Sequence, residues 1–165
     1  MIIRLRRQQV KATDKQFFIA EDLPRKVDEA NVKKEKKAGN LKVVWISRIA
    51  PKKNLKYAIE ILEETKSDIE FTIYGPAHTE EYWKECKQEL RKLPSNVKWE
   101  WKGNLDSESV VETLKHYHVF LFPTLGENFG HVIQEALSAG CPCIISDQTP
   151  WRDFESQGVG YVFSL

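Results

Sequence analysis

The stretch from Phe120 to Ile145 constrains the fold of this chain more than any other. An apolar run, His118–Phe122, has the length of a strand and leads into a turn that carries one proline and two glycines. Apolar residues at helical spacing follow, Gly140 is expected to end that helix, and residues 142–145 read as a second strand. The helix therefore begins at a glycine-bearing loop. Such a helix start presents free N–H groups and the positive end of the helix dipole, so it suits an anion.

Two carboxylates flank this helix start. Glu127 lies in the loop before the helix, and Glu135 lies inside it, beside the apolar face and one turn after His131. Helical side chains lean toward the N-terminus of their helix, so Glu135 is expected to reach back toward the loop. Carboxylates accept hydrogen bonds from sugar hydroxyls. A phosphate at the helix tip, with a polyhydroxyl group beside it, would suit this arrangement.

The chain from Leu41 onward alternates strand-like and helix-like segments. Further strands are predicted at Val43–Ile46, Ile69–Tyr74, Val97–Trp101 and Tyr161–Phe163, and further helices at Lys53–Lys66, at Thr79–Leu93 and after a capping Asp106. A turn is expected at residues 38–40, and a short helix within the loop Ser146–Ser156. The alternation predicts an α/β fold with a Rossmann-like, doubly wound, mainly parallel sheet of about six strands and helices on both faces.

The expected strand order is 3-2-1-4-5-6. Residues Val97–Trp101 alternate apolar and charged side chains with a period of two, which favours an edge position. This order places the first strand beside the strand 118–122, so the loops Ser47–Asn54 and Pro123–Gly130 face each other across the crevice where ligands bind. Trp151, in a later loop at the same edge, is expected to pack rather than to bind a ligand.

Composition excludes several classes of protein. The chain is 41% hydrophobic and 30% charged with a net charge of +1, so nothing general favours nucleic-acid binding. No apolar run approaches the roughly 20 residues of a transmembrane helix, and the start lacks the apolar core of a signal peptide. The three cysteines, Cys86, Cys141 and Cys143, show no disulfide pattern and are expected to be structural thiols in a reducing cytosol. A cytoplasmic protein is the expectation.

Common nucleotide and metal motifs do not occur in the sequence. No Gly-x-Gly-x-x-Gly follows the first strand, no Walker A motif is present, and no Asp-x-Asp pair would hold a divalent metal on a diphosphate. The loop Ser47–Asn54 instead carries three cations, Arg48, Lys52 and Lys53, at a strand end where a diphosphate would fit. From the residues alone, Arg48 and Lys53 are equally well explained as solvated charges.

The sequence Gly126-Glu-Asn-Phe-Gly130, followed from Glu135 by Glu-Ala-Leu-Ser-Ala-Gly-Cys-Pro, resembles the E-x7-E signature of retaining glycosyltransferases of family 4, or group 1. The resemblance covers about Leu41 to Leu165. It implies the GT-B fold, in which two Rossmann-like domains hold the substrates between them, with residues 41–165 as the nucleotide-sugar-binding domain and residues 1–40 as a linker. The N-terminal acceptor-binding domain and the usual C-terminal crossover helix would be missing, so the isolated chain is expected to be inactive.

The resemblance also implies roles for individual residues. Arg48 and Lys53 correspond to the pair that holds the donor diphosphate and stabilises the departing phosphate, and Glu127 would contact the transferred sugar. The implied donor contacts are Glu135 to the ribose, Asn128, Phe129, Gly130 and His131 to the sugar and phosphates, and Tyr74, Gly75 and Gly103 near the base. No cofactor and no metal are expected, and the donor would be a UDP-, GDP- or ADP-sugar.

The expected function is transfer of a sugar from a nucleoside-diphosphate sugar, in the synthesis of polysaccharide, glycolipid or another glycoconjugate. The first alternative is a non-catalytic nucleotide-binding module on the same fold. The second is an interaction domain whose basic start, residues 1–11, docks on a membrane or a partner. A lipid-linked acceptor, with the protein peripheral at the inner membrane face, would agree with that basic segment.

Overall fold

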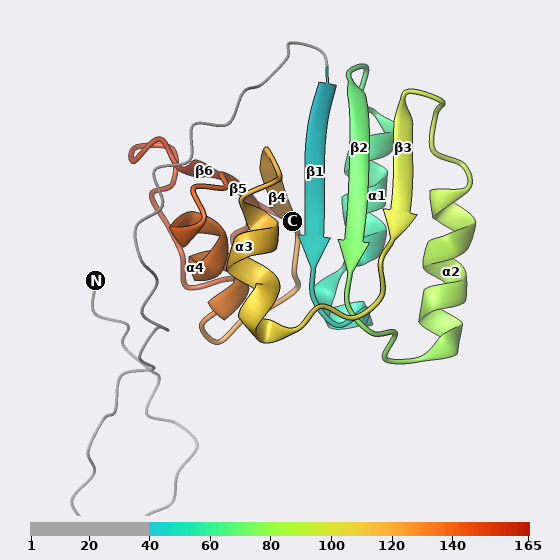
Figure 1. Ribbon diagram of the computed structural model, residues 1–165, viewed down its shortest axis with the longest axis horizontal. Coiled ribbons are helices and arrows are strands. Elements are labelled where there is room, and N and C mark those ends of the chain that lie inside the picture. The colour runs from blue at the N-terminus through green and yellow to red at the C-terminus, as the bar shows by residue number, and fades with distance from the viewer. Residues whose placement is uncertain (1–39) are drawn as a thin grey trace, which may run out of the picture.

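The computed structural model describes residues 40–165, and the expectations for residues 1–39, including the basic segment 1–11, lie outside this range. The described residues form a six-stranded parallel sheet with helices on both faces (Figure 1). The strands are β1 (Asn40–Ile46), β2 (Asp68–Tyr74), β3 (Val97–Trp101), β4 (Val119–Phe122), β5 (Cys143–Ser146) and β6 (Gly160–Phe163). Their order, β3-β2-β1-β4-β5-β6, confirms the predicted fold class and strand order.

The helices are α1 (Leu55–Glu63), α2 (Glu80–Leu90), α3 (Val110–Leu114) and α4 (His131–Ser138). In Figure 1, α1 lies behind the sheet beside α2, whereas α3 and α4 lie in front of it. Thr79 caps α2, because its hydroxyl accepts a hydrogen bond from the Tyr82 N–H. None of the described helices is long and apolar enough to cross a membrane.

The predicted helix Lys53–Lys66 is shorter than expected at both ends. Asn54 adopts a left-handed backbone (φ 57°), so α1 begins only at Leu55 and ends at Glu63. Residues Pro51–Lys53 form a separate 3₁₀ turn. Lys53 therefore belongs to the loop at the sheet edge and not to the helix, which leaves its side chain directed toward the neighbouring loop.

Three other local predictions are wrong. Of the turn expected at residues 38–40 only Asn40 is described, and it is the first residue of β1, paired with Asp68. Asp106 precedes a 3₁₀ turn at Ser107–Ser109, and its side chain makes no capping hydrogen bond. The loop after β5 contains hydrogen-bonded turns in place of a short helix, because Asp153 has a positive φ of 62° that interrupts a helical path.

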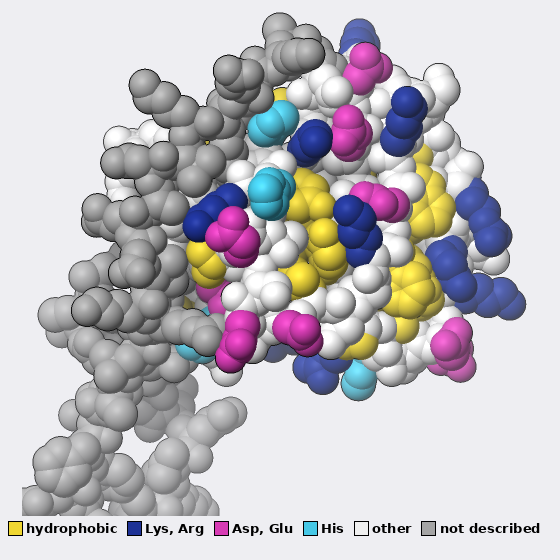
Figure 2. Space-filling view, in the orientation of Figure 1, with side chains coloured by type: hydrophobic (Ala, Val, Ile, Leu, Met, Phe, Trp, Pro, Cys, Tyr) yellow, Lys and Arg dark blue, Asp and Glu magenta, His cyan; other side chains and the backbone are white. Residues whose placement is uncertain are grey.

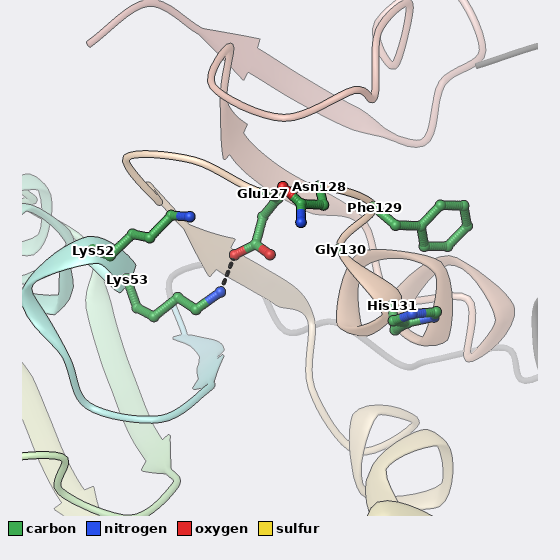
Figure 3. Close-up of a pocket in the computed structure, with 7 residues that line it drawn as sticks. All are labelled: Lys52, Lys53, Glu127, Asn128, Phe129, Gly130 and His131. Atoms are coloured by element: carbon green, nitrogen blue, oxygen red, sulfur yellow. Dashed lines mark hydrogen bonds and ion pairs between the residues drawn. The ribbon is translucent and has the colours of Figure 1, made fainter. Parts of the chain in front are cut away.

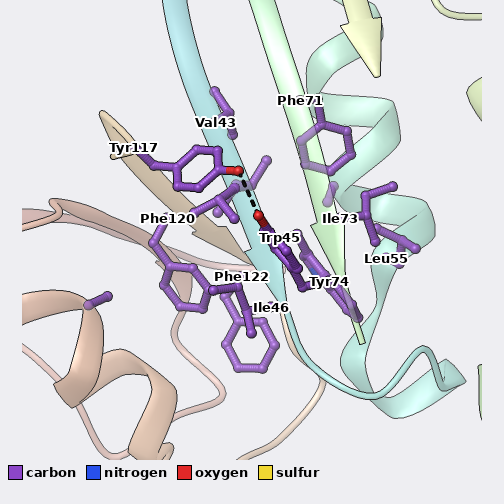
Figure 4. Close-up of a cluster of buried hydrophobic side chains, with 14 of the residues drawn as sticks. Val43, Trp45, Ile46, Leu55, Phe71, Ile73, Tyr74, Tyr117, Phe120 and Phe122 are labelled. Carbon is purple, nitrogen blue, oxygen red and sulfur yellow. Dashed lines mark hydrogen bonds between the residues drawn. The ribbon is translucent and has the colours of Figure 1, made fainter. Parts of the chain in front are cut away.

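The core lies on both sides of the central strands. Trp45, Phe71, Phe120 and Phe122 are fully buried around β1 (Figure 4). In contrast, β3 buries only Val97 completely, and Trp101 is 43% exposed, which confirms the predicted edge position. Cys86, Cys141 and Cys143 are buried free thiols, and burial raises the pKa of Cys86 to about 11, so this thiol stays protonated and unreactive at neutral pH.

Gly75 joins the carboxyl ends of three strands. Its N–H donates to the Gly103 carbonyl at 2.7 Å, and the Ser47 N–H donates to the Tyr74 carbonyl at 3.1 Å. Gly75 has φ 130°, and a Cβ built there would lie 1.7 Å from the Ser47 carbonyl oxygen. Only glycine permits this close approach, which brings the loops after β1, β2 and β3 together.

We predict that Gly75→Ala lowers the free energy of unfolding by at least about 3 kcal/mol, because backbone atoms must move to admit the methyl group. Gly103→Ala is the matched control, since Gly103 also has a positive φ (71°) but nothing lies within 4 Å of the position that its Cβ would take. This variant should lose only about 1 kcal/mol. Urea titration measures both losses, and equal losses would show that the close approach to Ser47 is unimportant.

Candidate functional site

The loops after β1 and β4 lie against each other at the carboxyl edge of the sheet, as predicted. The Leu125 N–H donates to the Lys52 carbonyl at 2.8 Å, and the Asn54 side-chain amide donates to the Pro123 carbonyl at 2.9 Å. These bonds link segments about 70 residues apart. The first joins backbone groups only, whereas the second depends on the Asn54 side chain.

A pocket of about 360 Å³ opens between the two loops. Figure 3 shows Lys52 and Lys53 on one side of it and the segment from Glu127 to His131 on the other. Of the residues singled out in the sequence, the structure thus brings Lys53, Glu127, Asn128, Phe129, Gly130 and His131 together. Lys52, noted in the sequence only as a further loop cation, also lines the pocket.

Lys53 and Glu127 form an ion pair at the centre of the site. The Lys53 ammonium donates to Oε1 of Glu127, and the two side chains are only 20% and 12% exposed. The ammonium also lies 5.7 Å from the centre of the Phe122 ring, which anchors it at the end of β4. Two groups expected to act on different parts of a ligand therefore bind each other, and Lys52 adds a positive charge to a pair that is neutral overall.

Helix α4 begins at the pocket wall. Gly130, its N-cap residue, has a left-handed backbone (φ 81°), and no side chain caps the helix. A Cβ at Gly130 would lie 2.8 Å from the Ile133 side chain, so glycine also fits this position for packing reasons. The first turn of α4 holds no acidic residue, so no side chain of that turn opposes the positive end of the helix dipole at the pocket.

The loop after β5 supports the pocket from behind. Trp151 Nε1 donates to the Phe129 carbonyl at 2.6 Å, and the two rings lie 5.7 Å apart with an edge-to-face geometry. The Glu127 N–H donates to the Gln148 carbonyl at 3.0 Å. Trp151 packs as expected, but it also fixes the backbone of the pocket loop. Sequence patterns offered no signal for these supports, because they join segments that meet only in the folded sheet.

A buried threonine joins both loops. Thr124 is 0% exposed, and its hydroxyl lies 3.1 Å from the Lys52 carbonyl and 3.2 Å from Oε1 of Glu127. Thr124 lies two residues after the end of β4, and in the sequence its only distinguishing feature is the preceding Pro123. The hydroxyl therefore touches the same carboxylate oxygen that binds Lys53.

The remaining predicted site residues lie outside the pocket. Arg48 is exposed after β1 and forms no ion pair within residues 40–165, and Glu135 is half-buried one turn along α4 from His131. The Tyr74 side chain turns into the core, where its hydroxyl lies 3.2 Å from that of Tyr117. Gly75 and Gly103 meet at the ends of β2 and β3. Neither Arg48 nor Glu135 lines the cavity that holds Lys53.

Figure 2 shows acidic and basic side chains interspersed over the middle of the described face and a group of basic side chains at its right-hand edge. Within residues 40–165, no group of three or more His, Cys, Asp or Glu side chains is placed to hold a metal ion. The cations and the helix start described above are therefore the groups available to an anionic ligand in this pocket.

Comparisons of the sequence with protein families and with known proteins point to the same class of protein. The model of the family described as glycosyl transferases group 1 matches residues 26–164. A Caenorhabditis elegans GDP-Man:Man(3)GlcNAc(2)-PP-Dol alpha-1,2-mannosyltransferase is 26% identical over 74% of this chain and 29% of its own length.

Solved structures share the fold. The Anabaena protein HepE in complex with UDP and glucose superposes with a TM-score of 0.63 at 22% identity, over 77% of this chain and 35% of that one. The lipopolysaccharide outer core galactosyltransferase WaaB gives a TM-score of 0.64 at 22% identity, over 78% of this chain and 36% of that one. The present chain thus spans about a third of the length of each of these three proteins.

We predict that Trp151→Phe loosens the pocket loop, because the variant keeps an aromatic ring but cannot donate to the Phe129 carbonyl. The stability loss should be about 1 kcal/mol, and the Glu127 amide should exchange its hydrogen roughly tenfold faster by NMR. Trp101→Phe is the control, since it removes a similar bond to the Gly75 carbonyl at 3.0 Å, away from the loop. Unchanged Glu127 exchange in Trp151→Phe would contradict the supporting role.

Proposed function

The chain belongs to the group 1 glycosyltransferase family, and we propose that its pocket binds the diphosphate and the sugar of a nucleoside-diphosphate sugar. The observation that carries this proposal is the convergence of Lys52, Lys53 and the start of α4 on one cavity beside Glu127. The cations and the helix dipole suit a diphosphate, and the carboxylate suits sugar hydroxyls.

The proposed reaction moves the sugar to an acceptor hydroxyl with retention of the anomeric configuration. The bond between the anomeric carbon and the donor phosphate breaks, its electron pair leaves with the nucleoside diphosphate, and a bond to the acceptor oxygen forms. Negative charge grows on the departing phosphate, where Lys53 and the α4 N-terminus stabilise it more in the transition state than before it. Removing one such group typically costs about 2–4 kcal/mol of barrier.

We assign Arg48 and Glu135 to the edges of the same donor. Arg48 is exposed on the loop that also carries Lys53, and a long side chain there can approach a diphosphate in the pocket. Glu135 lies one turn into α4 and leans toward its start, where a ribose would follow the phosphates. Gly75 and Gly103 then offer backbone near the base, while the buried Tyr74 ring contributes packing only.

The names of two similar proteins bear on the nucleotide and the acceptor. One relative is named for GDP-mannose and a dolichol-linked acceptor, and one similar structure holds UDP and glucose. We propose a hexose donor and a glycoconjugate acceptor, lipid-linked at a membrane surface. The acceptor would bind to a domain outside residues 40–165, because the chain spans about a third of its relatives, and these residues alone would transfer little sugar.

We predict that isothermal titration detects binding of one of UDP, GDP or ADP, or of its sugar, but not of NAD. Lys53→Met should weaken that binding at least about tenfold, because it removes the sheltered cation of the pocket. Lys56→Met is the matched control, since Lys56 pairs with Glu85 on the surface at 3.3 Å. Failure of every nucleotide to bind, or equal affinities for the two variants, would refute the proposal.

We also predict that the affinity for the nucleoside diphosphate is the same in EDTA as in excess magnesium. The physical reason is that Lys52, Lys53 and the α4 start together supply the positive charge that a metal would otherwise bring. The same titration in the two buffers makes the comparison. A loss of binding in EDTA beyond about twofold would show that a divalent ion belongs to the donor complex.

A further inference from the structure

The Thr124 hydroxyl is placed among more acceptors than it can serve. Its oxygen lies 3.1 Å from the Lys52 carbonyl, 3.3 Å from the Gly126 carbonyl and 3.2 Å from Oε1 of Glu127. The Gly126 N–H donates to the same hydroxyl at 3.3 Å. A hydroxyl carries one proton, so only one of the three acceptors receives a full hydrogen bond at a time.

The other hydrogen bonds of these three acceptors determine which of them needs the hydroxyl proton. The Lys52 carbonyl already accepts from the Leu125 N–H at 2.8 Å, and Oε1 of Glu127 already accepts from the Lys53 ammonium. While the ion pair is intact, Glu127 therefore has a charged donor and does not depend on the hydroxyl. If Lys53 leaves, the Thr124 hydroxyl is the neighbouring donor that the pocket offers to the same carboxylate oxygen.

The proposed nucleoside-diphosphate sugar would compete with Glu127 for Lys53. A diphosphate in the pocket carries more negative charge than one carboxylate and would draw the Lys53 ammonium toward it. Glu127 would then keep its charge with a side chain only 12% exposed, and a sheltered carboxylate without a donor is unfavourable. A hydrogen-bond donor that already lies beside Glu127 removes that penalty and keeps the carboxylate next to the sugar.

We propose that Thr124 is a positioning residue that holds the Glu127 carboxylate by its hydroxyl once Lys53 turns to the donor diphosphate. The inference rests on the proposed function of the pocket. Thr124 suits this role because it is itself fixed: its carbonyl accepts from the Ser146 hydroxyl, and its side chain is completely buried. The exchange moves one hydroxyl proton between acceptors and one ammonium between anions, with no covalent change.

The test is a double-mutant cycle read as affinity for the nucleoside diphosphate that the chain binds most tightly. Thr124→Val keeps the shape but has no proton to donate, so it should weaken binding about tenfold or more. Thr124→Ser keeps the proton and should stay within about threefold of the unmodified chain. In a Glu127→Gln background no carboxylate needs holding, so adding Thr124→Val should change affinity less than about twofold.

Two results would overturn the inference. One is an equal loss of nucleotide affinity on Thr124→Val with and without Glu127→Gln, which would mean that Thr124 acts on the fold alone. The other is an equal loss of affinity in Thr124→Ser and Thr124→Val. If Thr124→Val does not fold by circular dichroism, the buried Thr124 hydroxyl proton is followed by NMR in the unmodified chain. Its resonance should shift on adding the nucleotide and stay unchanged in Glu127→Gln, and the absence of that shift would also overturn the inference.

The same data separate this inference from the proposed function. If no nucleoside diphosphate binds the unmodified chain at about 10 mM, the donor site itself is refuted and the positioning role falls with it. If a nucleotide binds, Lys53→Met weakens it and the Thr124 variants do not, the donor site stands and the positioning role alone is refuted.

Discussion

The parallel pairing of β1 with β4 is the contact on which the site depends. Val43 pairs with Val119 and Val44 with Phe120, and this register joins the first three strands of the sheet to the last three. Because parallel strands end at the same edge, the loops that follow β1 and β4 must meet there. Buried aromatic rings such as Trp45 and Phe122, 6.3 Å apart, fill the space beneath that edge and hold the two strand ends at a fixed separation.

The charges of Lys53 and Glu127 are balanced before any ligand binds. Lys53 and Glu127 neutralise each other in a sheltered position, so the folded chain need not bury an unpaired charge. Lys52 and the α4 start leave the cavity attractive to an anion, and an anion that binds Lys53 competes with Glu127 for the ammonium. The Thr124 hydroxyl lies 3.2 Å from Oε1 of Glu127, so a hydrogen-bond donor for this carboxylate is in place when Lys53 binds another anion.

The predictable part of the structure is the part set by local pattern. Central parallel strands are buried on both faces and appear as apolar runs, so β1, β2, β4 and β5 were found within a few residues. The errors fall where one backbone angle decides the outcome, as at Asn54 and Asp153, whose left-handed conformations shorten one helix and remove another. Asparagine and aspartate adopt this conformation only when the surrounding contacts favour it, so composition does not reveal it.

By itself the sequence determined the alternation of strands and helices and the glycine-bearing loop at the start of α4, because periodicity and glycine placement are local properties. The strand order followed from the rule for doubly wound sheets and from the edge-like pattern of Val97–Trp101. Only the tertiary structure decided that Lys53 pairs with Glu127, that Thr124 touches the same carboxylate, and that Trp151 holds the Phe129 backbone. The Lys53–Glu127 contact joins positions 74 residues apart in the chain. Contacts at such separations arise when the sheet closes between β1 and β4, and the side-chain geometry that results is not encoded in any short segment.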